Sequence, residues 1–103
     1  MQKTINGAMF KSMIITASKL LEINRVTVDA LNVFPVPDGD TGTNMSLTVQ
    51  SAVKEILGCK SNNLNAVAEA AEKGALRGAR GNSGVILSQI LRGICSTVKD
   101  SNE

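Results

Sequence analysis

The segment 34–43, "FPVPDGDTGT", constrains the fold most strongly, because it cannot continue a helix. Pro35 and Pro37 fix φ and disfavour helix at the residue before each of them. Gly39 and Gly42 allow backbone shapes that other residues resist. Apolar residues recur at helical spacing on both sides of this segment. The sequence therefore predicts helices joined by a well-defined loop.

Four helices are expected, and their predicted ranges are 5–23, 43–58, 64–79 and 84–99. Asn24 and Arg25 break the first pattern, and "SNN" before the third helix is a turn and cap signal. Asn82 or Ser83 can cap the fourth helix. Its apolar positions form one row of Ile86, Ile90 and Ile94 and a neighbouring row of Leu87, Leu91 and Val98. We expect an all-α fold.

Composition and charge exclude several classes of function. Apolar residues make up 43% of the 103 residues, which is enough for a folded core, but the 2% aromatic content leaves no platform for stacking bases. The net charge of +2 comes from scattered lysines and arginines, so neither a nucleic-acid patch nor a membrane patch is expected. No apolar run approaches the roughly 20 residues of a membrane-spanning helix.

The cysteines and the absence of histidine narrow the chemistry further. Cys59 and Cys95 lie far apart and the chain has no His, which excludes a Cys/His zinc site and a His-dependent catalytic triad within it. Two isolated cysteines in helices are typical of reduced core residues. We therefore expect a cytoplasmic protein.

Asp38 and Asp40 flank Gly39, so their carboxylates could converge on one hard cation. The D-x-D-x-G order resembles the start of an EF-hand, but the sixth position holds Thr43 instead of Gly and the twelfth holds Val49 instead of Glu. Mg²⁺ fits better, because it takes one or two carboxylates and completes its shell with water and phosphate oxygens. The alternative is that both aspartates serve only as turn and capping residues.

The second irregular segment, "GARGNSG" at 78–84, directly precedes an apolar helix. A helix N-terminus beside glycines suits an anion such as phosphate, although no Lys-Ser/Thr follows to make a Walker A loop. It can equally be a simple interhelical turn, and Gly74 and Gly78 can mark close helix packing. Together, the two loops (32–45 and 78–84) supply what a Mg²⁺–nucleotide site needs without a P-loop.

The motifs "LNVFPVPDGDTGTNM" and "GARGNSGVILSQ", with "INGAMFKSMI" near the start, resemble the N-terminal domain of the fatty acid kinase catalytic subunit. That domain is similar to the nucleotide-binding (DhaL) subunit of dihydroxyacetone kinases. The resemblance covers residues 1–103 and implies roughly the first half of an antiparallel helical barrel that binds ATP or ADP with Mg²⁺.

The resemblance also implies roles for particular residues. Asp38 and Asp40 bind the metal, and Asn32 stands near the place of a third aspartate, where it offers a neutral oxygen. The phosphate contacts are expected from Thr41, Gly42, Thr43, Asn44, Asn82, Ser83 and Gly84, while Met45 and Leu87 border the nucleotide.

The implied activity is an ATP-dependent kinase whose acceptor is held elsewhere. In fatty acid kinase, a separate binding protein presents a fatty acid, which becomes an acyl phosphate; in dihydroxyacetone kinases, another subunit holds a triose. This chain is shorter than the family's nucleotide domain, so we expect uncovered apolar helix faces that favour self-association or a complementary fragment. The alternatives are an ADP-binding module of the glycerone kinase type and a catalytically silent helical assembly fragment; the isolated chain is expected to be inactive alone.

Overall fold

The computed structural model describes residues 5–31 and 40–101, with the side chains of the last two left out. These residues form four helices: α1 (Gly7–Leu31), α2 (Thr41–Gly58), α3 (Leu64–Arg77) and α4 (Gly81–Ser101). No strand occurs within these two ranges. The prediction of an all-α bundle is confirmed.

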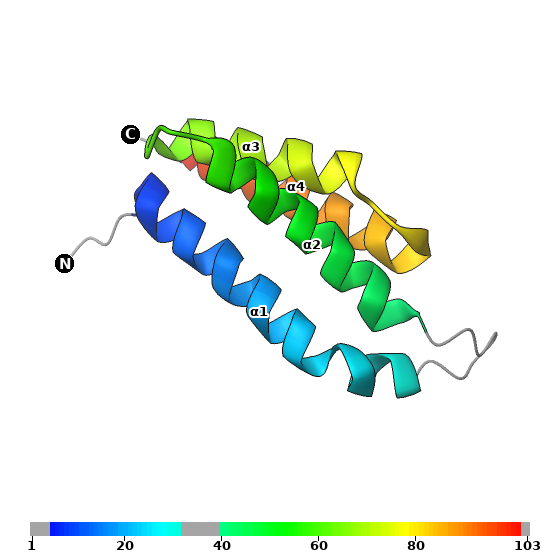
Figure 1. Cartoon of the computed structure of the whole chain (residues 1–103). Helices are drawn as coiled ribbons and strands as arrows, with labels where there is room; N and C mark the ends of the chain where they lie inside the picture. The colour runs from blue at the N-terminus through cyan, green and yellow to red at the C-terminus, as the bar shows by residue number, and fades with distance from the viewer. Residues whose placement is uncertain (1–4, 32–39, 102–103) are drawn as a thin grey trace.

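Helix α2 lies at the centre of the bundle (Figure 1). It packs against α1 on one side and against α3 and α4 on the other, while α1 also contacts α3. Within the described residues α1 and α4 make no contact with each other, so they form the two outer edges. Because successive helices run in opposite directions, α2 and α4 both begin at the end of the bundle where α1 and α3 finish (Figure 1).

Helix α1 is longer than predicted, because it continues through Asn24 and Arg25 to Leu31. The side-chain amide of Asn24 donates to the Leu20 carbonyl one turn earlier at 2.8 Å, so this side chain is accommodated within the helix. Arg25 forms an ion pair with Glu22 at 3.5 Å. The prediction that these two residues end the helix is wrong, since local polar contacts and packing on α2 hold the last two turns in place.

The helix starts agree with the sequence only in part. Asn63 caps α3 by accepting hydrogen bonds from the amides of Asn65 and Ala66, as the "SNN" signal predicts. Helix α4 begins at Gly81, so Asn82 and Ser83 lie inside its first turn and the prediction that one of them is the cap is wrong. Gly81 has a φ of +66°, a conformation that side-chain-bearing residues avoid.

Helices α2 and α3 approach so closely that Gly74 has no room for a side chain. A Cβ atom at this position would lie 2.6 Å from the Ser51 carbonyl oxygen and 2.8 Å from the Ala52 Cα. The Ser51 hydroxyl donates to the Gly74 carbonyl at 2.7 Å. The alternative reading of Gly74 as a packing glycine is therefore correct.

Both edge helices expose apolar residues. Helix α4 buries Leu91 and Cys95, while the row of Ile86, Ile90 and Ile94 is exposed. Helix α1 buries Phe10, Ile14 and Ser18, while Met9, Met13 and Leu20 are exposed. These two rows match the expectation of uncovered apolar faces.

Candidate functional site

The structure brings the described part of the first irregular segment, residues 40–45, next to the second at the end of the bundle where α2 and α4 begin. The Ser83 hydroxyl donates to the Thr41 carbonyl at 3.4 Å. A Cβ atom on Gly81 would lie 2.4 Å from Asn44 Nδ2, so the start of α4 rests directly on the Asn44 side chain. Residues 37 to 42 positions apart in sequence thus share one small surface, as a site built from both loops requires.

Thr48, which the sequence analysis did not single out, fixes this junction. Its buried hydroxyl accepts from the Arg80 amide at 3.2 Å and donates to the Asn44 carbonyl at 2.8 Å. A Cβ atom on Gly84 would lie 2.5 Å from Thr48 Oγ1, which explains the glycine there. Spacing along the chain could have identified Thr48, because it follows Asn44 by one helical turn and therefore lies on the same face of the helix.

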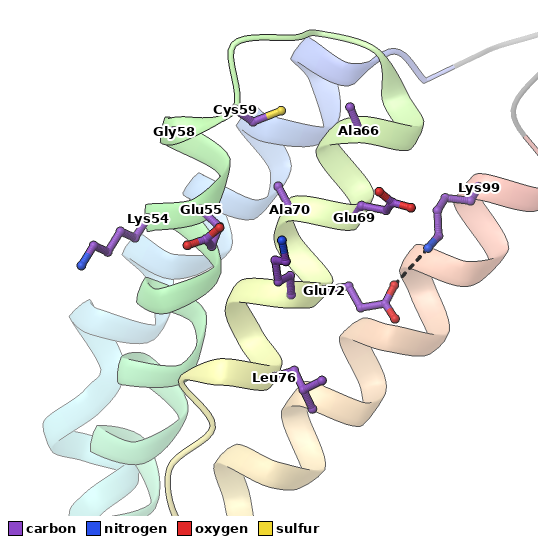
Figure 2. Close-up of a pocket in the computed structure, with 11 residues that line it drawn as sticks. Lys54, Glu55, Gly58, Cys59, Ala66, Glu69, Ala70, Glu72, Leu76 and Lys99 are labelled. Carbon is purple, nitrogen blue, oxygen red and sulfur yellow. Dashed lines mark hydrogen bonds and ion pairs between the residues drawn. The ribbon is translucent and has the colours of Figure 1, made fainter.

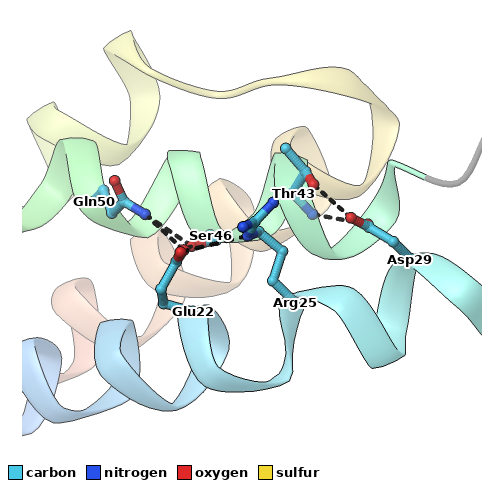
Figure 3. A network of polar contacts seen from close by, with 6 residues as sticks. All are labelled: Glu22, Arg25, Asp29, Thr43, Ser46 and Gln50. Carbon is cyan, nitrogen blue, oxygen red and sulfur yellow. Dashed lines mark hydrogen bonds and ion pairs between the residues drawn. The ribbon is translucent and has the colours of Figure 1, made fainter.

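Asp40 is the N-cap residue of α2, yet its side chain makes no capping hydrogen bond to the first turn. The Thr43 amide donates instead to Asp29 Oδ1 at 3.0 Å, and the Thr43 hydroxyl donates to Asp29 Oδ2 at 2.5 Å (Figure 3). Asp29 lies near the end of α1, in a segment that was not predicted to be helical. The capping role considered for Asp40 thus belongs to Asp29.

These contacts also set the ionisation of Asp29. The Thr43 hydroxyl and then the Thr43 amide hold the pKa of the Asp29 carboxyl below its ordinary value, with a smaller contribution from the positive charge of Arg25. Asp29 therefore carries its negative charge at neutral pH. A carboxylate beside the first turn of α2 is favoured by the dipole of that helix.

A second polar group joins α1 to α2 one turn farther into the bundle (Figure 3). Glu22 Oε1 accepts from the hydroxyl of Ser46, which is fully buried, at 2.8 Å and from Gln50 Nε2 at 3.2 Å. The α1–α2 interface is thus polar toward the candidate site, whereas Phe10 and Ile14 make it apolar at the other end.

The remaining predicted site residues fall into three groups. Asp38 and Asn32 lie outside the described residues. Gly42 is buried against α1, where a Cβ atom would lie 2.6 Å from the Arg25 carbonyl oxygen. The others lie on or beside the junction with varied exposure: Thr41, Met45 and Ser83 are half-buried and Asn82 is exposed.

Asp40 is the one predicted metal ligand that can be placed. Within residues 5–31 and 40–101, no three His, Cys, Asp or Glu side chains gather closely enough to hold a metal ion. The carboxylate of Asp40 is not used in capping α2, so it fits the donor chemistry of a Mg²⁺ ligand. The metal site as a whole stays a prediction.

A groove of about 620 Å³ among the described residues lies elsewhere (Figure 2). Its walls come from the second half of α2, from α3 and from the end of α4. Glu72 lies in it beside Lys99, whose ammonium donates to the carboxylate at 3.2 Å. Its lysines and glutamates balance one another, so it offers no concentrated charge for a phosphate.

Comparison with known proteins shows the family to which the chain belongs. The chain is 50% identical over 99 residues to uncharacterized proteins of Staphylococcus epidermidis, Staphylococcus haemolyticus and Staphylococcus aureus. The match covers 96% of this chain and 18% of the length of each relative. None of the described helices is long and apolar enough to cross a membrane. The sequence model of the DAK2 domain matches residues 35–103, so the chain belongs to the DAK2 domain family, a membership that points to a nucleotide-binding module of the kinase type.

Proposed function

We propose that this chain is the Mg²⁺–ATP-binding part of a cytoplasmic kinase that transfers a phosphoryl group to an acceptor held by a partner protein. The observation that carries the proposal is the meeting of two helix N-termini at one end of the bundle, joined by the Ser83–Thr41 hydrogen bond. Helix N-termini present free amide groups and a positive dipole end, both of which favour phosphate. Membership of the DAK2 domain family supports the same reading.

The proposed roles follow from the chemistry of each residue. The first turn of α2 offers the Thr41 backbone amide to the phosphates, and the Asn44 and Ser83 side chains lie where they can add donors. Gly42 is buried against α1 and its amide faces the Asp29 carboxylate, so its proposed contribution is the position of the turn. Thr43 has its amide and hydroxyl committed to Asp29, so its contribution to phosphate binding is the position of the turn. Asn82, Gly84 and Met45 complete the predicted nucleotide contacts.

Asp38 and Asp40, with the Asn32 side chain, are the proposed Mg²⁺ ligands. A bound Mg²⁺ would neutralise phosphate charge, which is the main requirement of phosphoryl transfer. The protein's own part is to hold the phosphates with fixed dipoles, which cost no reorganisation during the reaction.

For the acceptor we propose a fatty acid on a separate binding protein, with an acyl phosphate as product. This rests on the resemblance of both motifs to the fatty acid kinase catalytic subunit. A triose, as in dihydroxyacetone kinases, is the alternative that the same nucleotide site would serve. In both cases the acceptor, a fatty acid or a triose, is delivered by another protein or subunit.

A second candidate function is helical assembly without catalysis, and the exposed row of Ile86, Ile90 and Ile94 on α4 favours it. The same row would support a homo-oligomer or a complementary fragment. The kinase function requires the chain to bind a nucleotide, whereas the assembly function does not.

Isothermal titration of the chain with Mg²⁺–ATP separates them. We expect Asp38→Ala and Asp40→Ala each to weaken binding at least about tenfold, because an incomplete metal shell cannot offset the phosphate charge. Glu69→Ala is the matched control, since Glu69 is an exposed carboxylate in the first half of α3, and α3 begins at the end of the bundle opposite the site. Equal binding by all four proteins would refute the metal role, and no binding by the unmodified chain would favour the assembly function.

A further inference from the structure

Helix α2 is capped by a residue from another helix. In most helices the N-cap side chain accepts a hydrogen bond from the amide two or three positions later. For α2 the N-cap is Asp40 and the amide three positions later belongs to Thr43. That amide donates to Asp29, which lies 14 residues earlier in the chain.

The close packing of α1 on α2 brings Asp29 to this amide. Gly42 has no side chain, and the backbone of α1 at Arg25 occupies the space that a Cβ atom would need. One turn farther along α1, Asp29 faces the first turn of α2 and receives both donors of Thr43 (Figure 3). The close approach of the two helix backbones thus positions Asp29. Its carboxylate accepts the hydrogen bond that the side chain of the N-cap residue, Asp40, would usually accept.

We propose that Asp29 is a positioning residue for the nucleotide site: by capping α2 from α1, it leaves the Asp40 carboxylate available to a divalent cation. The inference rests on the proposed function, in which Asp40 is a metal ligand. Without Asp29, the Thr43 amide would have no acceptor from α1, and the Asp40 side chain is the nearest N-cap group able to replace it. The Asp40 carboxylate would then both cap the Thr43 amide and bind the cation, and the first contact would weaken the second.

Mn²⁺ binding, followed by electron paramagnetic resonance of the free ion, measures the availability of Asp40. We expect Asp29→Ala to weaken Mn²⁺ binding by about threefold to thirtyfold, the factor that corresponds to a capping hydrogen bond. Asp29→Asn should restore most of the affinity, because Asn keeps a carbonyl oxygen that can accept from the Thr43 amide. Glu22→Ala is the matched control, since it removes another polar contact between α1 and α2 and leaves the cap intact.

A double substitution tests whether Asp29 acts through Asp40. If it does, Asp29→Ala should cause no further loss of Mn²⁺ binding in a protein that already carries Asp40→Ala. The chemical shift of the Thr43 amide proton gives an independent readout: it should change in Asp29→Ala and stay constant in Glu22→Ala. Helical circular dichroism checks that each variant is folded.

The outcomes separate this inference from the function on which it rests. If the unmodified chain binds no Mn²⁺ through Asp40, the proposed metal role itself fails. If it binds Mn²⁺ and a folded Asp29→Ala variant binds equally well, the metal role survives and the positioning role of Asp29 is overturned. Equal losses from Asp29→Ala with and without Asp40 would also overturn it, because the effect would not pass through Asp40.

Discussion

Replacing Gly74 by alanine should destabilise the bundle, although alanine is the better helix former. Gly74 lies in the interior of α3, where glycine costs about 1 kcal/mol relative to alanine. The added methyl group, however, would lie 2.6 Å from the Ser51 carbonyl oxygen and 2.8 Å from the Ala52 Cα. These are backbone atoms, so α2 and α3 must move apart to accept it.

The expected change in the free energy of unfolding combines two destabilising contributions and one stabilising contribution. Overpacking of this kind costs about 1–3 kcal/mol. Separation of the helices also weakens the Ser51–Gly74 hydrogen bond of 2.7 Å, which is worth about 1 kcal/mol. After the gain of about 1 kcal/mol in helix propensity, the free energy of unfolding should fall by about 1–3 kcal/mol.

Gly93→Ala is the matched control, because Gly93 also lies inside a helix and no heavy atom of a neighbouring group lies within 4 Å of its added Cβ. It should raise the free energy of unfolding by up to about 1 kcal/mol. Urea unfolding followed by circular dichroism therefore measures a difference of about 1–4 kcal/mol between two chemically identical substitutions. If both alanines stabilise the protein, the close approach of α2 and α3 is refuted.

Three further predictions concern the site end of the bundle and the two thiols. Gly81→Ala should lower the free energy of unfolding by at least about 1–2 kcal/mol, because Gly81 has a φ of +66° and faces Asn44; an unchanged urea midpoint would contradict this. Since the pKa of Asp29 is lower in the folded chain than its ordinary 3.8, its stabilising effect is complete above that pH and is lost as the pH falls through the folded value. Asp29→Asn should therefore show a weaker loss of thermal stability between neutral and acidic pH than the unmodified chain, and equal losses would count against the Thr43 contact. Burial, followed by the charge of Glu72, raises the pKa of Cys95 to about 11, so iodoacetamide at mildly alkaline pH should label Cys59 well before Cys95; simultaneous labelling in the folded state would rule out the burial of Cys95.

Local sequence signals predicted most of the fold correctly. The break predicted between the first two helices agrees with the end of α1 at Leu31 and the start of α2 at Thr41. The Asn63 cap starts the third helix, because an Asn side chain caps through amides only two and three residues away. The meeting of the two loops could also be anticipated, since both were expected to lead into helix N-termini. The particular contact between Asn44 and Gly81 could not be predicted, because spacing along the chain does not show which residues of the two segments meet.

The failures share one physical cause, which is contact between residues far apart in sequence. Asn24 reads as a helix breaker, yet α1 continues past it because α2 packs against the following turns. Asp29 was overlooked because it fell in a segment assigned to no helix, and its acceptor role depends on Thr43 across that segment. Uncovered apolar faces were expected, but the sequence did not identify the row of Ile86, Ile90 and Ile94 as one of them, because periodicity finds apolar faces without telling which of them has a partner.

The bond between Asp29 and Thr43 has a consequence for how this family can vary. It joins two residues 14 positions apart and so closes the stretch between them at its base. Once the base is fixed by α1 and α2, the closure entropy rises only slowly with length, by about 0.6 kcal/mol for each doubling. The stretch between Asp29 and Thr43 can therefore change in length while α2 keeps the same first turn, so that stretch and helix are free to diverge separately.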